Sequence, residues 1–246
     1  MGGVTGGAAA AAALSLAVLL TACGSEESDP APAADPAPEV TAPATPAAGP
    51  ITDGNALRAA LPTTADLAPG FAVLPDTPDD PAGRDADDAT DASSTDPARC
   101  ANVLDTIARQ SPGAVATAEQ NFSGPGFTSI DVDAASYAGS GAADAFAAVQ
   151  ASVRTCTTFT GTDALGTAVE YRVEPLARPD AGDAAIAFRV TTTSEGFTLV
   201  SDAVVTSVDS TVVQVVTTGP DALAGDDTTV LARTTAQRVH AAAGPR

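Results

Sequence analysis

The sequence predicts an α+β domain, built on a mostly antiparallel sheet of about six strands with helices packed on one face. The last third of the 246-residue chain alternates apolar and polar residues, as half-buried strands do. The middle of the chain contains two segments whose apolar residues recur with helical spacing. Short links join the later strands, which favours an antiparallel meander. We therefore expect a single folded domain that follows a disordered N-terminal segment.

The helical signals lie mainly in the first half of this domain. A short helix is expected over 55–61, where Pro62 ends it. Asp96-Pro97 supplies a cap and a first-turn proline for a second helix, and Ser140-Gly141 begins a third. One face of each of these two helices is apolar, at i, i+3, i+4 and i+7 or close to it. The residues on these faces are Cys100, Val103, Leu104 and Ile107 in the second helix, and Phe146, Val149, Val153 and Cys156 in the third.

The strand signals begin with a hairpin over 115–122 and 127–137, joined by a Gly-Pro-Gly turn. In its second strand, apolar residues alternate with Asp131 and Asp133, so this side of the sheet is expected in water. Asp226-Asp227 caps a final helix, which carries Leu231, Ala232, Thr235, Ala236 and Val239 on its inner face. Four further strands are expected over 169–174, 186–190, 197–206 and 211–218, with a hairpin turn at Asp209-Ser210 between the last two.

The first 22 residues have the pattern of a lipoprotein signal peptide. Residues 8–20 are apolar except for Ser15, which matches a signal-peptide core and is too short to span a bilayer comfortably. Leu20-Thr21-Ala22-Cys23 follows at once and resembles the lipobox of bacterial lipoproteins. The resemblance implies that Cys23 is acylated, for example by palmitate, and becomes the new N-terminus. The first seven residues contain no Arg or Lys, so either the true start lies elsewhere or export relies on the terminal amine.

Residues 23–52 are expected to form a disordered Pro/Ala-rich tether, because they contain almost no large apolar side chains. Extended chain of this kind reaches roughly 80 Å, enough to lift a domain from the outer face of the cytoplasmic membrane into the cell wall. The folded domain is expected over 53–243. Within it, the acidic segment 76–96 is expected to be a mobile loop, because its aspartates lack the spacing of a calcium-binding loop.

Three cysteines remain to be assigned after the signal peptide is recognised. Cys23 is committed to lipid in this interpretation, and Cys100 and Cys156 both lie on buried helical faces. In an exported protein the two are expected to form a disulfide, contributing about 4 kcal/mol at most through loop entropy. The alternative, a reactive thiol, needs a basic neighbour that holds a thiolate. Arg99 and Arg154 are near in sequence but are more simply exposed helix positions.

The charge balance excludes several functions. Eleven basic residues, all Arg, stand against 31 acidic ones, which gives a net charge of −20. Nucleic acid and polybasic membrane contacts are therefore excluded. A single His and three Cys do not make a zinc site, and no phosphate-binding or dinucleotide-binding glycine pattern occurs. We expect no metal, no cofactor and no nucleic-acid partner.

The sequence also gives little support for catalysis. A Ser-His-Asp triad would need His240, which is expected to be an exposed residue near the end of the last helix, and no G-x-S-x-G occurs. Paired carboxylates could cleave sugars, but Trp is absent and Tyr numbers only two. We therefore expect a protein that is not an enzyme.

Two arginines are the candidate ligand-binding residues. Arg172 and Arg189 fall on the polar sides of adjacent expected strands, where they could hold a carboxylate or phosphate by paired hydrogen bonds. The competing interpretation is cross-strand pairing with Glu170 or Glu174.

The order of several short motifs resembles one known family. The motifs are Leu61-Pro62, Pro69-Gly70-Phe71, Arg99-Cys100-Ala101, Ala145-Phe146, Cys156 with Phe159, the run 171–176, Gly182-Asp183 and Ala187-Phe188-Arg189. Together they resemble the extracellular sensor domain of the mycobacterial receptor kinase PknH and the stand-alone actinobacterial lipoproteins built on it, over about residues 53–242.

The resemblance implies a mixed sheet-and-helix domain with a solvent-exposed cleft for an extracellular ligand, and it does not imply an enzyme. This chain departs from the kinase in two ways: it can form one disulfide where the kinase domain has two, and it carries no kinase motifs. The expected function is a membrane-anchored ligand-binding or sensor lipoprotein, whose partners are a small molecule or cell-wall component and an envelope protein. The alternative is an envelope lipid carrier or scaffold, which would need a deep apolar cavity or a protein-binding surface.

Overall fold

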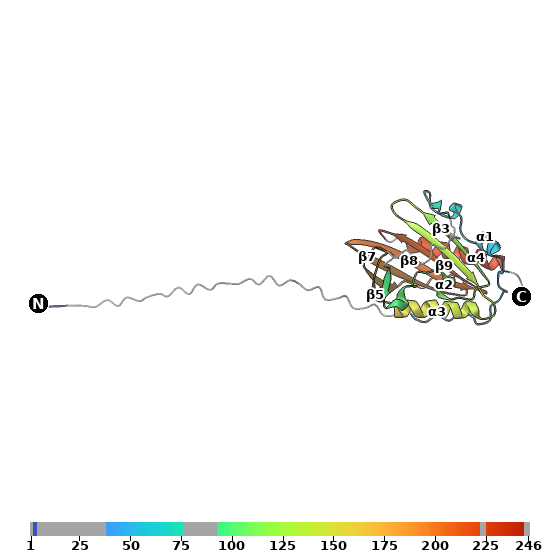
Figure 1. The fold of residues 1–246 in the computed structure, drawn as a ribbon, viewed down its shortest axis with the longest axis horizontal. Coiled ribbons are helices and arrows are strands. Elements are labelled where there is room, and N and C mark those ends of the chain that lie inside the picture. The colour runs from blue at the N-terminus through green and yellow to red at the C-terminus, as the bar shows by residue number, and fades with distance from the viewer. Residues whose placement is uncertain (1, 4–37, 76–92, 222–224, 244–246) are drawn as a thin grey trace. The chain divides into compact units, whose positions relative to one another are not determined.

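The computed structural model describes residues 2–3, 38–75, 93–221 and 225–243 (Figure 1). The chain divides into the units Met1–Pro32 and Ala33–Arg246, and the fold below is that of the second unit. The expected signal peptide, Cys23 and most of the acidic segment 76–96 lie outside the described residues. No helix in the described ranges combines the length and the apolar character that crossing a membrane requires.

Within the described residues, one antiparallel sheet of nine strands forms the centre of the domain, with the order β1-β3-β4-β9-β8-β7-β6-β5-β2. Strands β6 to β9 are the expected meander, and β3 and β4 are the expected hairpin. The expectation of about six strands was too low because β1 and β2 are too short to show alternation and β5 contains one large apolar residue. The strands are β1 Ala72–Val73, β2 Ser94–Asp96, β3 Ala116–Ser123, β4 Ser129–Ser136, β5 Thr158–Thr162, β6 Ala168–Pro175, β7 Ala184–Ser194, β8 Phe197–Val208 and β9 Thr211–Gly219.

Three of the four expected helices are present. They are α1 Gly54–Ala59, α3 Gly141–Thr155 and α4 Gly225–Ala242. The expected helix from Asp96-Pro97 is instead two short pieces, the 3₁₀ helix η2 (Ala98–Cys100) and α2 (Ile107–Gln110). Thr106 has an extended backbone and interrupts the helix there, since its N–H is bonded to the side chain of Asp105.

The helices cover both faces of the sheet, so the expectation of helices on one face was wrong. Phe146 and Val149 of α3 pack with Ala203 and Val205 of β8 on one side. On the other side of the sheet, Leu57 of α1 and Leu231 of α4 pack with Val204, which points away from α3. The central strands are apolar on both sides, as in sheets buried between two layers. Figure 1 shows α3 along the lower side of the strands.

Residues 38–52, which we call the strap, were expected to belong to the disordered tether but lie against the domain. Val40, Ala42 and Ile51 are buried in it. The N–H of Val40 donates to Oε1 of buried Gln150 at 2.8 Å, and Nε2 of Gln150 donates to the Val40 carbonyl at 3.0 Å. Disorder was predicted because this segment has few large apolar side chains. A few small apolar side chains and satisfied backbone groups are nevertheless sufficient to hold the strap against the domain.

Two further attachments hold the C-terminal part of the strap. The N–H of Ala48 donates to Oδ1 of Asp209 at 2.9 Å, and the hydroxyl of Ser210 donates to the Ala48 carbonyl at 2.8 Å. The N–H of Ile51 donates to Oγ of Ser136 at 3.0 Å. The folded domain therefore begins before residue 53.

Candidate ligand-binding site

An apolar cleft lies between α4, the sheet and the segment that follows the 3₁₀ helix η1 (Thr64–Asp66). We call it the α4 cleft. Its volume is about 300 Å³. Most of its walls are apolar, with a few hydroxyls and carboxylates among them. The lining residues are Asp66 of η1, Leu67, Ala68 and Phe71 from the segment that follows it, Ile130 and Thr217 from the sheet, and Asp227, Val230, Leu231 and Thr234 from α4.

An ion pair holds the two walls of this cleft together. Arg238 of α4 donates from Nη1 to Oδ2 of Asp66 at 2.8 Å and from Nη2 to Oδ1 at 2.5 Å. This hydrogen bonding keeps the pKa of Asp66 well below its usual value. Asp66 also accepts the N–H of Thr63 at 2.8 Å, which closes the capping box of η1. The wall that carries Leu67 and Phe71 is thereby fixed against α4.

The polar groups of the α4 cleft are mostly engaged within the protein. The hydroxyls of Thr217 and Thr228 bond to each other at 2.7 Å, and Thr234 donates to the Val230 carbonyl at 2.9 Å. The cleft is consequently suited to an apolar body with few polar groups. The α4 cleft was not predicted from the sequence. One sequence signal was present, because Val230 is an apolar residue beside the predicted inner face of the last helix. In the structure Val230 is 54% exposed.

A second hollow lies on the sheet itself, where β2, β5, β6 and β7 adjoin. We call it the threonine groove. Its volume is about 390 Å³. The register of the strands places seven lining residues of the groove on one side of the sheet: Asp96, Thr158, Thr160, Glu170, Arg172, Thr191 and Thr193. On the opposite side, Phe159 and Tyr171 stack with their ring centroids 4.5 Å apart.

The structure places the two candidate arginines on the same side of the sheet but in different roles. Arg172 lines the threonine groove, and its Nη1 lies 3.8 Å from Oε1 of Glu174 on its own strand. Arg189 donates from Nε and Nη2 to both oxygens of Asp202, at 2.6 and 2.8 Å. These hydrogen bonds raise the pKa of Arg189. Asp202 is 2% exposed, so Arg189 neutralises a buried carboxylate.

His240 has a partner that the sequence did not indicate. Its Nδ1 lies 2.6 Å from Oδ2 of Asp209, while 66% of the imidazole side chain is exposed. Asp209 occupies the β8–β9 turn with a φ of 51°, and it also accepts the N–H of Ala48. The pair therefore joins the end of α4, the turn and the strap. No spacing in the sequence connects two residues so far apart.

Asp133 was expected to face water and is instead buried under α2. Its Oδ1 accepts the N–H of Ile107 at 2.7 Å, and its Oδ2 accepts Nε2 of Gln214 at 3.1 Å. Burial raises its pKa to about 7. The expectation failed because α2 covers this side of β4, which local alternation cannot reveal. In the described part of the chain, no three His, Cys, Asp or Glu side chains are arranged to hold a metal ion.

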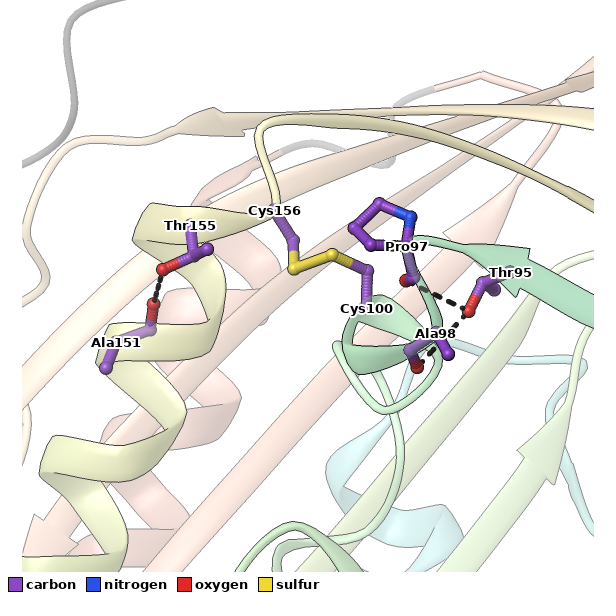
Figure 2. Close-up of a disulfide and its surroundings, with 7 residues drawn as sticks. All are labelled: Thr95, Pro97, Ala98, Cys100, Ala151, Thr155 and Cys156. Carbon is purple, nitrogen blue, oxygen red and sulfur yellow. Dashed lines mark hydrogen bonds between the residues drawn. A yellow bond between two sulfur atoms is a disulfide. The ribbon is translucent and has the colours of Figure 1, made fainter.

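The expected disulfide joins Cys100 of η2 to Cys156 at the end of α3, with a Cα–Cα distance of 5.7 Å (Figure 2). Beside it, the Thr95 hydroxyl lies 3.4 Å from the carbonyls of Pro97 and Ala98. The bond links the short edge strand β2 and η2 to the helix layer. Because β2 lines the threonine groove, the disulfide also stabilises the edge of that groove.

A comparison of folds matches this structure to the extracellular domain of PknH from Mycobacterium tuberculosis, with a TM-score of 0.59 and 13% sequence identity. The match covers 78% of this chain and 98% of that domain. A second match is an uncharacterized protein from Mycobacterium smegmatis (Rv0999 ortholog), with a TM-score of 0.40, 15% identity, and coverage of 79% and 98%. No protein-family model matches the sequence, and a search of curated proteins finds no significant match. The resemblance to the PknH domain is thus confirmed as a likeness of fold.

Proposed function

We propose that this chain is an extracytoplasmic lipoprotein whose folded domain binds a small ligand in the α4 cleft and does not transform it. Three observations support the proposal. The fold is that of the extracellular domain of PknH, the N-terminal segment resembles a lipoprotein signal with Cys23 as its acylated residue, and the α4 cleft is mainly apolar. The domain would lie outside the cytoplasmic membrane, held there by lipid and extending into the cell wall.

The α4 cleft is the observation that carries the choice of ligand. Binding pockets for small molecules typically have volumes of about 300–1,000 Å³ and apolar walls with a few polar groups. At about 300 Å³ the α4 cleft is at the lower end of that range. It is too small to enclose a complete membrane lipid, so we favour a compact ligand with an apolar body over the role of lipid carrier.

The test narrows the cleft without disturbing the core. Ala68 lines the cleft and is exposed, so Ala68→Trp places an indole in the space that the ligand would occupy. The control is Ala164→Trp, an exposed alanine in the β5–β6 turn. Binding of Nile red, a neutral apolar fluorophore, should fall by about tenfold or more in the first variant and stay unchanged in the second.

Native mass spectrometry of the lipoprotein from its own envelope identifies the natural ligand. A discrete bound mass that is lost in Ala68→Trp and kept in Ala164→Trp supports the proposal. Equal Nile red affinity in all three proteins would overturn the α4 cleft as the site. A co-purifying intact lipid that survives Ala68→Trp would favour the carrier, and a co-purifying envelope protein in place of a small mass would favour the scaffold.

A further inference from the structure

The described residues that line the threonine groove all belong to strands of the sheet, and no helix of the described ranges contributes one. Arg172 is opposite Thr158 on one neighbouring strand and Thr191 on the other. Glu170 is likewise opposite Thr160 and Thr193. The groove is therefore a flat array of hydroxyls around charges of both signs, quite unlike the α4 cleft.

Arg172 is the one cation among the described residues that line the groove, and it has hydrogen-bonding capacity to offer a ligand. Arg172 Nη1 and Glu174 Oε1 are 3.8 Å apart, which is beyond hydrogen-bond distance, and both side chains are 41% exposed. A guanidinium has five N–H donors in a planar fork that matches a carboxylate. Arg189 is different, because both oxygens of buried Asp202 already occupy its fork.

The groove also contains carboxylates at a defined spacing from this cation. Glu170 is two residues from Arg172 on the same strand, so their Cα atoms are about 6.7 Å apart. Asp96 is opposite Thr160, beyond which lies Glu170, and so adds a second carboxylate at the β2 edge. A dipeptide in extended conformation separates its terminal ammonium and carboxylate by a similar distance of about 7 Å.

The charge balance of the surroundings selects among ligand classes. A simple anion would meet Glu170, Glu174 and Asp96 around one Arg172, on a chain whose net charge is −20. An apolar molecule would desolvate four threonine hydroxyls and these charges. A zwitterion avoids both penalties, because each of its charges faces the opposite one.

We propose that the threonine groove binds a short peptide with free termini. The terminal carboxylate pairs with Arg172, and the terminal ammonium lies between Glu170 and Asp96. The hydroxyls of Thr158, Thr160, Thr191 and Thr193 hydrogen-bond the peptide group between them. This site is separate from the α4 cleft and does not depend on it.

The experiment is calorimetric titration of the full chain in mild detergent with alanylalanine as the probe. N-acetylated alanylalanine removes the ammonium charge, and alanylalanine amide removes the carboxylate. We expect the free dipeptide to bind and each blocked form to bind about tenfold more weakly or worse. This comparison uses the unaltered protein, so it does not depend on the folding of any variant.

Two substitutions then assign the charges. Arg172→Gln should lower the affinity for alanylalanine to that for its amide, and should leave the affinity for the amide nearly unchanged. Glu170→Gln should lower the affinity for alanylalanine to that for its N-acetylated form, and should leave the affinity for the acetylated form nearly unchanged. Arg178→Gln, an exposed arginine outside the groove, should change nothing.

Three results would overturn the proposal. One is equal affinity for the free and blocked peptides. Another is no detectable binding of the free dipeptide at millimolar concentration. The third is charge-dependent binding that survives both Arg172→Gln and Glu170→Gln, which would place the peptide elsewhere on the molecule.

Discussion

Arg172 and Arg189 lie on the same side of the sheet, but their loss should have very different effects on stability. Arg189→Gln leaves the buried Asp202 carboxylate without its cation, so we expect a loss of about 3 kcal/mol in the free energy of unfolding. Arg172→Gln removes an exposed, long ion pair and should cost less than about 0.5 kcal/mol. Urea unfolding of both variants at pH 7 measures the difference, and equal losses would contradict this assignment of roles.

Asp133 should make stability depend on pH in an unusual direction. Its pKa is raised to about 7 in the folded state, so the folded protein holds a proton that the unfolded chain releases near pH 4. The stabilisation from this group is complete below about pH 4 and declines as the pH rises to about 7, by about 1.4 kcal/mol per unit.

Asp133→Asn should flatten this dependence, because an amide does not titrate. Urea unfolding at pH 5 and pH 7 compares the variant with the unaltered chain. The control is Asp221→Asn, at an exposed aspartate, which should keep the original slope. A slope in Asp133→Asn as steep as that of the unaltered chain would show that another group is responsible.

At the scale of an element, the strap should depend on Gln150. Gln150→Ala removes both hydrogen bonds to Val40 and leaves the buried N–H and carbonyl of that residue unsatisfied. We expect the strap to open, with amide hydrogen exchange over 40–51 faster by about tenfold or more. The control is Gln237→Ala, on the exposed side of α4. Unchanged protection of the strap in Gln150→Ala would refute the role of this side chain.

Elements with a complete local pattern were predictable from the sequence. The β6–β9 meander has period-two alternation in most of its strands, and α3 and α4 have period-3.6 apolar stripes, so each signal lies within the element itself. The continuous helix expected after Asp96 does not form, because the Thr106 N–H donates a hydrogen bond to the Asp105 side chain that competes with the helix. The burial of the strap was not predicted because it depends on Gln150, which is far away in the sequence.

The candidate sites were less predictable than the elements. Arg172 was found because charged residues on a strand show which side is polar. Its surroundings, however, come from four strands, and strand order is not written in any one of them. The α4 cleft joins a loop, the sheet and a helix, and the Asp66–Arg238 pair that fixes it links opposite ends of the domain sequence. Contacts of this kind follow from the complete fold.

For the whole molecule, the decisive expectation is its attachment to the membrane. Cys23→Ala removes the only residue that the proposed signal would acylate, so the protein should pass from the membrane pellet to the soluble fraction. Sedimentation of cell envelopes followed by immunodetection measures the partition, and Cys100→Ala with Cys156→Ala serves as the cysteine control. Continued sedimentation of the Cys23→Ala protein with membranes would contradict lipid anchoring.

The strap changes the mechanics of such an anchor. With residues 38–52 attached to the domain, the 17 residues from Cys23 to Val40 would reach roughly 50 Å at the polyproline rise, short of the distance that the whole Pro/Ala-rich segment would allow. A lipid at Cys23 would therefore hold the domain at a shorter maximum distance from the bilayer than a fully free segment would. Within the described residues, a pull on the strap from its N-terminal end would load the two hydrogen bonds between Val40 and Gln150 of α3 before it reached Ala48 and Ile51.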